Sequence, residues 1–318
     1  MSPTPRPAAD VGVDPELVGA LVRAQFPELA HLEPRFADDG WDNVVYRLGP
    51  ELAVRLPRRD AAHVLLLHEI RWLPFLAPRL PLPVPVPLHR GKPGEGYPYH
   101  WVIVPWLAGR SAAMVPAAAR DDYAVALAAF FRALHVPAPA DAPRNPVRGV
   151  PLRLRDEAVR PRLRAVSAPQ RGALLEMWER GLAEAEHVGP RLWLHGDPHP
   201  HNVLVREGAS AAADGNGGPA AGPGAGHAAA LLGGVIDFGD LTAGDPASDL
   251  AVAWLHFTPR GRAEFRERLA GHGLYSPGTW VRARAWAANY ASLMSALPPG
   301  DPLHAVGTHG IEQLIAEP

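Results

Sequence analysis

Residues 194–205 of the chain read LHGDPHPHNVLV, and residues 234–240 read GVIDFGD. Asn202 follows Asp197 by five positions, and Asp237 comes at the end of a second apolar run. A carboxylate on a short loop can accept a proton, while amide and carboxylate oxygens suit a hard cation such as Mg²⁺. The spacing therefore predicts a phosphoryl-transfer site, with Asp197 as the base and Asn202 and Asp237 as the metal ligands.

Length and composition are those of a globular protein. The chain has 318 residues, of which 47% are hydrophobic and 20% charged, so it can bury the cores of two lobes. Its formal net charge of −2 gives no general attraction for nucleic acid or for an anionic membrane surface. We therefore expect neither among its partners, and the oligomeric state stays open.

The cysteine count and the N-terminal sequence indicate the cellular compartment in which the protein is expected. The chain contains no cysteine, which excludes disulfides, thiolate metal sites and cysteine nucleophiles, and which fits a reducing environment. Residues 1–9 are Pro-rich and lack the apolar core of a signal peptide, so a flexible tail is expected there. No run approaches the roughly eighteen apolar residues of a membrane span. These features predict a soluble, cytoplasmic protein.

The order of the predicted elements indicates an α+β protein with two lobes. An early helix is predicted over 14–26, an antiparallel hairpin over 44–48 and 52–56, a helix over 60–76 and a buried strand over 99–104. After residue 121 the pattern becomes helical and is interrupted by one short hairpin that carries the two motifs. The predicted helices of this part are 123–135, 152–166, 170–187, 249–257, 261–271, 279–297 and one near 311.

This change in character sets the expected domain boundaries. Residues 1–104 would form an N-terminal lobe, residues 105–110 a hinge, and residues 111–318 a helical C-terminal lobe. Within the second lobe, residues 208–230 consist almost entirely of Gly, Ala and Pro and have almost nothing to bury. We expect this segment to be a mobile insertion.

Three histidines beside Asp197 allow a second interpretation of the motif. His195, His199 and His201 are of a type that binds zinc, so a metal-dependent hydrolase is an alternative. However, no further His/Asp motif has hydrolase spacing. We expect His195 to pack and form hydrogen bonds inside the loop instead.

The motifs together resemble a known family. The segments His195-Gly196-Asp197-x₄-Asn202, Ile236-Asp237-Phe238 and Gly244-Asp245-Pro246-x₂-Asp249 are similar to those of the aminoglycoside phosphotransferase family. Residues 40–43 (GWDN) and 54–58 (VRLPR) resemble the branch that contains macrolide phosphotransferases. The resemblance runs from about 36 to about 255. It implies a protein-kinase-like two-lobe fold, with a small antiparallel-sheet N-lobe that binds nucleotide and a larger helical C-lobe for catalysis and substrate.

The resemblance also implies roles in the C-terminal lobe. Asp197 would be the catalytic base, and Asn202 and Asp237 would hold Mg²⁺ on the nucleotide. Asp249 would brace the catalytic loop by hydrogen bonds, and Asp245 would orient the segment after the metal ligand. With His195, these two carboxylates would support the site structurally.

In the N-terminal lobe the resemblance implies a nucleotide site for ATP or GTP. Glu69 would hold Arg55, and Val104 and Trp106 would flank a hinge that reads the base through backbone groups. Two features depart from the kinase pattern: Arg55 replaces the usual lysine, and the phosphate loop has a single glycine. Asn43 and backbone amides would then cradle the phosphates. Arginine keeps the charge and offers a planar fork to phosphate.

The acceptor is the least defined part of the prediction. The family implies an antibiotic, an aminoglycoside or a macrolide, but no cluster of acidic residues outside the motifs suits a polycation. Four aromatic residues near the C-terminus are interpreted as core, with an acceptor pocket as the alternative: Trp254, Trp280, Trp286 and Tyr290. A metabolic kinase for an amino alcohol or a sugar, and a nucleotide-binding relative without catalysis, are the alternative functions.

Overall fold

The computed structural model describes residues 7–206, 231–271 and 273–317. The predicted insertion at 208–230 and residues 1–6 of the predicted tail lie outside the described residues. Within the described ranges, no helix combines the length and the apolar character that crossing a bilayer requires.

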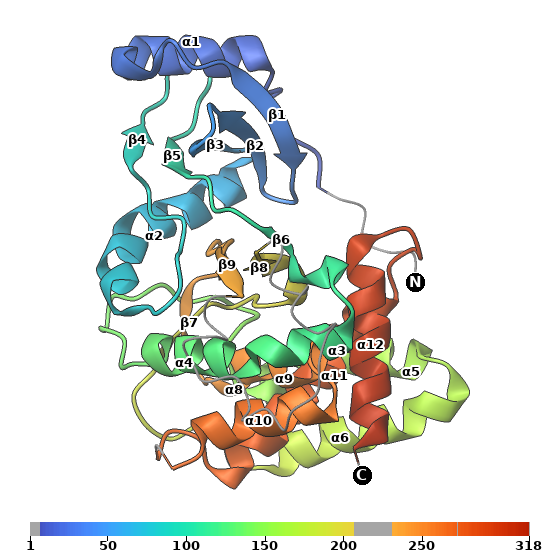
Figure 1. The fold of residues 1–318 in the computed structure, drawn as a ribbon. Helices are drawn as coiled ribbons and strands as arrows, with labels where there is room; N and C mark the ends of the chain where they lie inside the picture. The colour runs from blue at the N-terminus through green and yellow to red at the C-terminus, as the bar shows by residue number, and fades with distance from the viewer. Residues whose placement is uncertain (1–6, 207–230, 272, 318) are drawn as a thin grey trace, which may run out of the picture.

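The N-terminal part is built on a five-stranded antiparallel sheet with the order β1-β2-β3-β5-β4 (Figure 1). The predicted hairpin is present as β2 (Asn43–Leu48) and β3 (Leu52–Pro57). The predicted third strand is β5 (Trp101–Pro105), which pairs with β3 and with the short β4 (His89–Gly91). The sequence pattern missed β1 (Pro34–Asp39), because this edge strand is mostly exposed and shows no apolar alternation.

Two helices accompany this sheet. The helix α1 (Pro15–Gln25) begins where the Asp14 carboxylate accepts a hydrogen bond from the Leu17 N–H at 2.8 Å, which caps the first turn. The helix α2 (Asp60–Leu76) contributes Leu66 to a small core with β3 and β5, while Leu73 and Leu76 pack into the large core of the helical part. The helix α2 therefore connects the two cores.

Five short strands lie in the C-terminal part and position the motifs. The strand β8 (Val203–Val205) pairs with β6 (Arg110–Ser111) and β9 (Leu232–Val235), and β7 (Leu192–Leu194) pairs with β10 (Thr242–Gly244). The loop that contains Asp197 connects β7 to β8, and the segment that contains Asp237 connects β9 to β10. The sequence pattern predicted the hairpin that carries the two motifs, which corresponds to β8 and β9. It missed β6, β7 and β10.

The remaining residues are mainly helical, as predicted, so the α+β class is confirmed. The predicted helix at 249–257 is split in two, and α11 packs against α5, α6, α8, α9 and α12. The helices are α3 (Ala117–Arg120), α4 (Ala124–Leu134), α5 (Asp156–Ala165), α6 (Ala168–Ala183), α8 (Ala247–Leu250), α9 (Val252–His256), α10 (Pro259–Leu269), α11 (Pro277–Ser295) and α12 (Pro302–Ala316).

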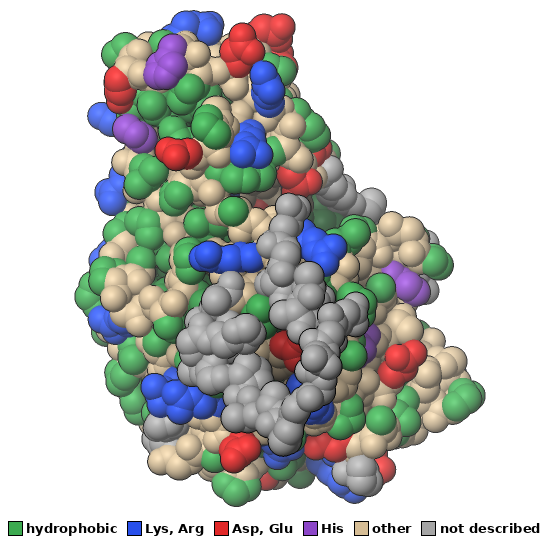
Figure 2. All heavy atoms as spheres, viewed as in Figure 1, with side chains coloured by type: hydrophobic (Ala, Val, Ile, Leu, Met, Phe, Trp, Pro, Cys, Tyr) green, Lys and Arg blue, Asp and Glu red, His purple; other side chains and the backbone are tan. Residues whose placement is uncertain are grey.

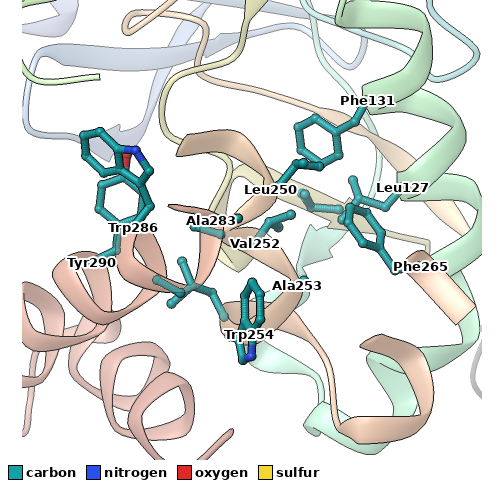
Figure 3. Packing of buried hydrophobic residues seen from close by; sticks show 14 of the residues in the cluster. Leu127, Phe131, Leu250, Val252, Ala253, Trp254, Phe265, Ala283, Trp286 and Tyr290 are labelled. Atoms are coloured by element: carbon teal, nitrogen blue, oxygen red, sulfur yellow. The ribbon is translucent and has the colours of Figure 1, made fainter. Parts of the chain in front are cut away.

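The aromatic residues of this part mostly belong to its core. Trp254, Trp286 and Tyr290 are buried among residues of α4, α8, α9, α10 and α11, and Trp280 is partly buried against the same cluster (Figure 3). On the described part of the face in Figure 2, acidic and basic side chains are interspersed, in keeping with the small net charge.

Candidate active site

Asp197 lies in the loop between β7 and β8, and its backbone is held on both sides. Its N–H donates to His195 Nδ1 at 3.2 Å, and its C=O accepts from the Asn202 side-chain amide at 2.8 Å. The preceding Gly196 has φ of +90°, and a Cβ there would lie 2.2 Å from the Asp240 carbonyl oxygen. Only glycine fits this position. The shape of the loop therefore depends on the His-Gly-Asp order.

His195 connects this loop to the segment that contains Asp237. Because its Nδ1 accepts from a backbone N–H, the neutral ring carries its proton on Nε2, which donates to the Ile236 C=O at 3.0 Å. The imidazole also packs on Phe238, with ring centroids 4.6 Å apart. His195 is thus a packed, hydrogen-bonded residue of the loop.

Asp249 is fully buried and accepts hydrogen bonds from the same loop. Its carboxylate receives the N–H groups of His195 at 2.7 Å and of Gly196 at 3.0 Å. His135 Nε2 lies 3.2 Å from the same carboxylate, and His135 Nδ1 lies 2.9 Å from the Tyr275 hydroxyl. Because Asp249 is fully buried and bonded to the backbone of this loop, its role is to hold the loop.

Asp245 is a second buried carboxylate in this region. Arg282 Nε donates to its Oδ2 at 2.7 Å, and the Ala247 N–H donates to its Oδ1 at 3.0 Å. Its own N–H donates to the Gly149 C=O at 2.9 Å. These contacts tie the segment after Asp237 to α11 and to the 143–151 loop.

The Asp197 carboxylate faces two cationic partners. Arg148 Nη2 donates to Oδ1 at 3.0 Å, and His199 Nε2 lies 3.4 Å from Oδ2. Burial raises the pKa of the Asp197 carboxyl, but the charges of Arg148 and His199 outweigh this effect and hold the pKa below its ordinary value. Asp197 is therefore ionised at neutral pH, as a base must be.

Arg148 was missed by sequence analysis, because nothing in its neighbourhood distinguishes it from the many other arginines. It contacts a second carboxylate, Asp240, whose Oδ2 lies 3.3 Å from Arg148 Nε. Asn145 donates to Asp240 Oδ1 at 2.7 Å. Burial raises the pKa of Asp240, Arg148 opposes this, and the nearby charges of Asp197 and Asp237 raise the pKa further.

Arg55 and Glu69 lie together between β3 and α2. Arg55 Nη1 and Nη2 donate to the two Glu69 carboxylate oxygens at 2.6 and 3.0 Å, and both residues are buried. Arg55 Nη2 also lies 4.0 Å from Asp237 Oδ1. This bidentate pair holds the guanidinium rigidly next to the second motif.

The other residues named for the nucleotide site lie beside opposite ends of β3, Asn43 opposite Pro57 and Val104 opposite Ala53. Asn43 begins β2 after the turn at residues 40–42, and within the described residues its buried Oδ1 has no hydrogen-bond partner. Val104 is buried in β5 beside Ala53 of β3. The Trp106 N–H donates to the Glu51 C=O at 2.6 Å, and a cavity of about 630 Å³ lies between the β2–β3 turn and residues 105–109.

Asn202 and Asp237 are the residues whose oxygens suit a metal. Because the Asn202 Nδ2 donates to Asp197, its Oδ1 points away from that bond as a neutral oxygen ligand. Asp237 has φ of +63° and a side chain that is 55% exposed. An amide and a carboxylate oxygen fit Mg²⁺, which keeps several water ligands in such sites.

The alternative zinc cluster does not form. Among the described residues, no group of three or more His, Cys, Asp or Glu side chains is arranged to hold a metal ion. His201 instead contacts the Ser111 hydroxyl at 3.2 Å and the Pro302 C=O at 3.1 Å, while His195 is engaged with Ile236. His195 and His201 therefore form hydrogen bonds with different parts of the chain.

Comparisons with known proteins indicate the family and the fold of the chain. A family model described as "Phosphotransferase enzyme family" matches residues 33–212 and 229–286. The interruption between these ranges falls inside the Gly- and Ala-rich stretch. A search of curated proteins finds no significant match to the chain.

Solved structures with the same fold include two kinds of phosphotransferase. The GDP complex of wild-type aminoglycoside 2′-phosphotransferase-IIIa has a TM-score of 0.67 and 17% identity, covering 96% of this chain and 99% of its own. A macrolide 2′-phosphotransferase from Brachybacterium faecium has a TM-score of 0.57 and 21% identity, covering 91% and 99%. At these identities the similarity establishes the fold.

Proposed function

Because the chain belongs to the phosphotransferase enzyme family, as its resemblance to aminoglycoside phosphotransferases implied, we propose that it transfers the γ-phosphate of ATP or GTP to a hydroxyl of a small molecule. The reaction class is that of a small-molecule O-phosphotransferase. The observation that supports the specific site is the position of Asp197, an ionised carboxylate at the end of a loop whose backbone is held by Asp249.

Asp197 acts on the acceptor hydroxyl. The hydroxyl oxygen attacks the γ-phosphorus, the bond from the γ-phosphorus to the β-phosphate oxygen breaks, and the hydroxyl proton passes to the Asp197 carboxylate. Because the transition state of phosphoryl transfer is loose, the hydroxyl needs orientation more than early deprotonation. A carboxylate with a lowered pKa is adequate for this task.

Asn202 and Asp237 would hold Mg²⁺, whose charge neutralises the phosphate oxygens when it is bound. Arg55, fixed by Glu69, contributes a guanidinium to the phosphates from the side of the sheet. Asn43 and the backbone amides of the 40–43 turn complete the binding site for the nucleotide phosphates. Val104 and Trp106 flank the base-binding hinge at residues 105–110, which separates the proposed lobes at 1–104 and 111–318.

An antibiotic hydroxyl is the first candidate acceptor, because both kinds of structural relative act on antibiotics according to their names. A metabolic hydroxyl compound is the second candidate. The carboxylates around Asp197, namely Asp240, Asp245 and Asp249, are all engaged by donors of the protein itself. They are therefore poorly placed to bind the ammonium groups of an aminoglycoside.

The test is a nucleotide-consumption assay with Mg²⁺ and either ATP or GTP, run across aminoglycosides, macrolides, amino alcohols and sugars. We expect one acceptor class to stimulate consumption and to be recovered with one added phosphate. Mg²⁺ with saturating nucleotide should also raise the thermal stability, because a ligand at about 100 times its Kd adds about 2.7 kcal/mol. No stabilisation by either nucleotide would contradict the proposal.

A further inference from the structure

Arginines gather beside Asp197 where α5 packs on α11. The Arg148 guanidinium carbon lies 4.9 Å from the centroid of the Tyr290 ring, and Arg162 Nη2 donates to Asn289 Oδ1 at 2.7 Å. Arg155 ends the short helix η5 (Leu152–Arg155), directly before α5. The positive charges of Arg155 and Arg162 both lie close enough to that of Arg148 to repel it.

Several buried donors at this junction have no acceptor. Within the described residues, three nitrogens are buried without a hydrogen-bond partner: Arg155 Nε, Arg162 Nε and Trp286 Nε1. The Tyr290 hydroxyl lies close to Arg148 and interacts with it. We call the residues Arg155, Arg162, Trp286 and Tyr290 the donor pocket. The Trp286 and Tyr290 rings lie side by side on α11, with centroids 5.3 Å apart (Figure 3). Arginine and tryptophan nitrogens only donate, so the group that would complete them must accept.

The charge of this region is also uncompensated. Arg148 is neutralised by Asp197 and Asp240, whereas within the described residues no carboxylate pairs with Arg155 or Arg162. Burial lowers the pKa of both arginines, and the positive charge of Arg148 lowers each of them further. An oxyanion at this position would supply both the acceptor atoms and the missing negative charge.

We propose that the acceptor of this phosphotransferase carries a carboxylate or phosphate group, which binds Arg155 and Arg162 in the donor pocket while the acceptor's hydroxyl lies at Asp197. This inference rests on the proposed function and narrows its substrate class to anionic hydroxyl compounds. A polycation would meet repulsion here instead. Arg155 and Arg162 are partly exposed as residues, although their Nε atoms are buried.

The experiment compares matched compounds that differ in charge. The full chain, loaded with Mg²⁺ and a nucleotide analogue that cannot transfer its phosphate, is titrated with glucuronate, glucose and glucosamine, and with glycerate, glycerol and aminopropanediol. Binding is followed by thermal stability. We expect the anionic member of each set to bind at least about tenfold more tightly than the neutral one, because a hydrogen bond to a charged group is worth that factor or more. Glycerol phosphate, added as a further arm, distinguishes a phosphate ligand from a carboxylate.

Variants then assign the effect to the pocket. Arg155→Gln and Arg162→Gln should each weaken binding of the anionic compound by about 10- to 100-fold. Both should leave Mg²⁺–nucleotide binding unchanged. Arg164→Gln, an exposed arginine on the same helix, is the matched control and should change neither.

The outcomes separate this inference from the function on which it rests. If Mg²⁺ and nucleotide fail to bind the wild-type protein, the proposed function is wrong. Three other outcomes, each with nucleotide bound, would overturn only the inference of an anionic acceptor. In the first, the neutral or cationic compounds bind as tightly as the anions; in the second, no compound binds; in the third, Arg155→Gln and Arg162→Gln behave like the control.

Discussion

The catalytic loop and the donor pocket both contact Arg148, and they differ in how completely their polar groups are bonded. In the loop, the N–H groups of His195, Gly196 and Asp197 all have acceptors. In the pocket, three buried donors have none among the described residues. A buried polar group without a partner is costly, so it is retained chiefly where something else completes it. The backbone donors on the N-terminal side of Asp197 and at Asp197 itself are thus bonded in the free protein, whereas the pocket requires a ligand.

This difference separates two tasks of one enzyme. A loop whose backbone N–H groups at residues 195–197 are all bonded is held in place there, and rigid placement of a base is what phosphoryl transfer asks of the protein. A pocket with unsatisfied donors discriminates between ligands, because only an acceptor of the right charge relieves the deficit. The predictions below test the two halves of the comparison.

The largest effect is expected from Asp197→Asn. Removing a general base costs about 10²–10⁴-fold in rate, and the amide should preserve the fold. The measurement is kcat for phosphorylation of the acceptor found in the screen, with the unfolding free energy as a check on integrity.

Asp240→Asn is the matched control for this change, because its carboxylate contacts the same Arg148. We expect it to cost far less in kcat, since Asp240 is engaged by Asn145 and Arg148. If Asp240→Asn lowered kcat more than Asp197→Asn, Asp197 would not be the base.

The next effect concerns stability. Asp249→Asn removes an acceptor from a fully buried site that receives two backbone N–H groups and faces His135. Each buried donor left without a partner costs about 1–3 kcal/mol, so the unfolding free energy should fall by about 3 kcal/mol or more. Urea denaturation measures the loss. Asp122→Asn, whose side chain is 49% exposed, should cost less than about 1 kcal/mol; equal losses would show that the loop is not held through Asp249.

Arg148 joins the two regions, and its removal should appear in the pH profile. Because Arg148 lowers the pKa of Asp197 while burial raises it, Arg148→Gln raises the pKa, and the base becomes protonated at a higher pH. The acidic limb of kcat/KM should move up by roughly 1–3 pH units. The same carboxyl contributes stability above its unfolded pKa of about 3.9, and this contribution is lost as the pH falls toward the lowered folded pKa. Arg144→Gln, exposed in the same loop, should leave the acidic limb where it is.

The comparison also shows what sequence reasoning can reach. Asp197 and Asn202 are five positions apart in one loop, and Asp237 follows a short apolar strand, so their relation is visible before folding. Family membership, the α+β class and the main helices followed from such local patterns. The hinge and lobe boundaries remain proposals, as do the roles of Asn43, Val104 and Trp106.

The donor pocket was out of reach for a physical reason. Arg148, Arg155 and Arg162 come from a loop, a short helix and α5, and they meet α11 only in the folded chain. A sequence shows each of them as one arginine among many. Trp286 was interpreted as a core residue, and it is buried, but burial alone did not reveal that its Nε1 lacks a partner among the described residues.

The smallest effect distinguishes a bonded indole from an unbonded one at equal burial. Trp178 Nε1 donates to Asp156 Oδ1 at 2.7 Å, whereas Trp286 Nε1 has no partner among the described residues, and both side chains are fully buried. Trp178→Phe and Trp286→Phe remove the same atoms, but only Trp178→Phe also removes a hydrogen bond. The unfolding free energy should therefore fall by about 1 kcal/mol more in Trp178→Phe, the net worth of a typical hydrogen bond. Urea denaturation of both variants measures the contrast. Equal losses from the two variants would mean that Trp286 Nε1 is bonded in the free protein, and the donor pocket would then contain one donor fewer.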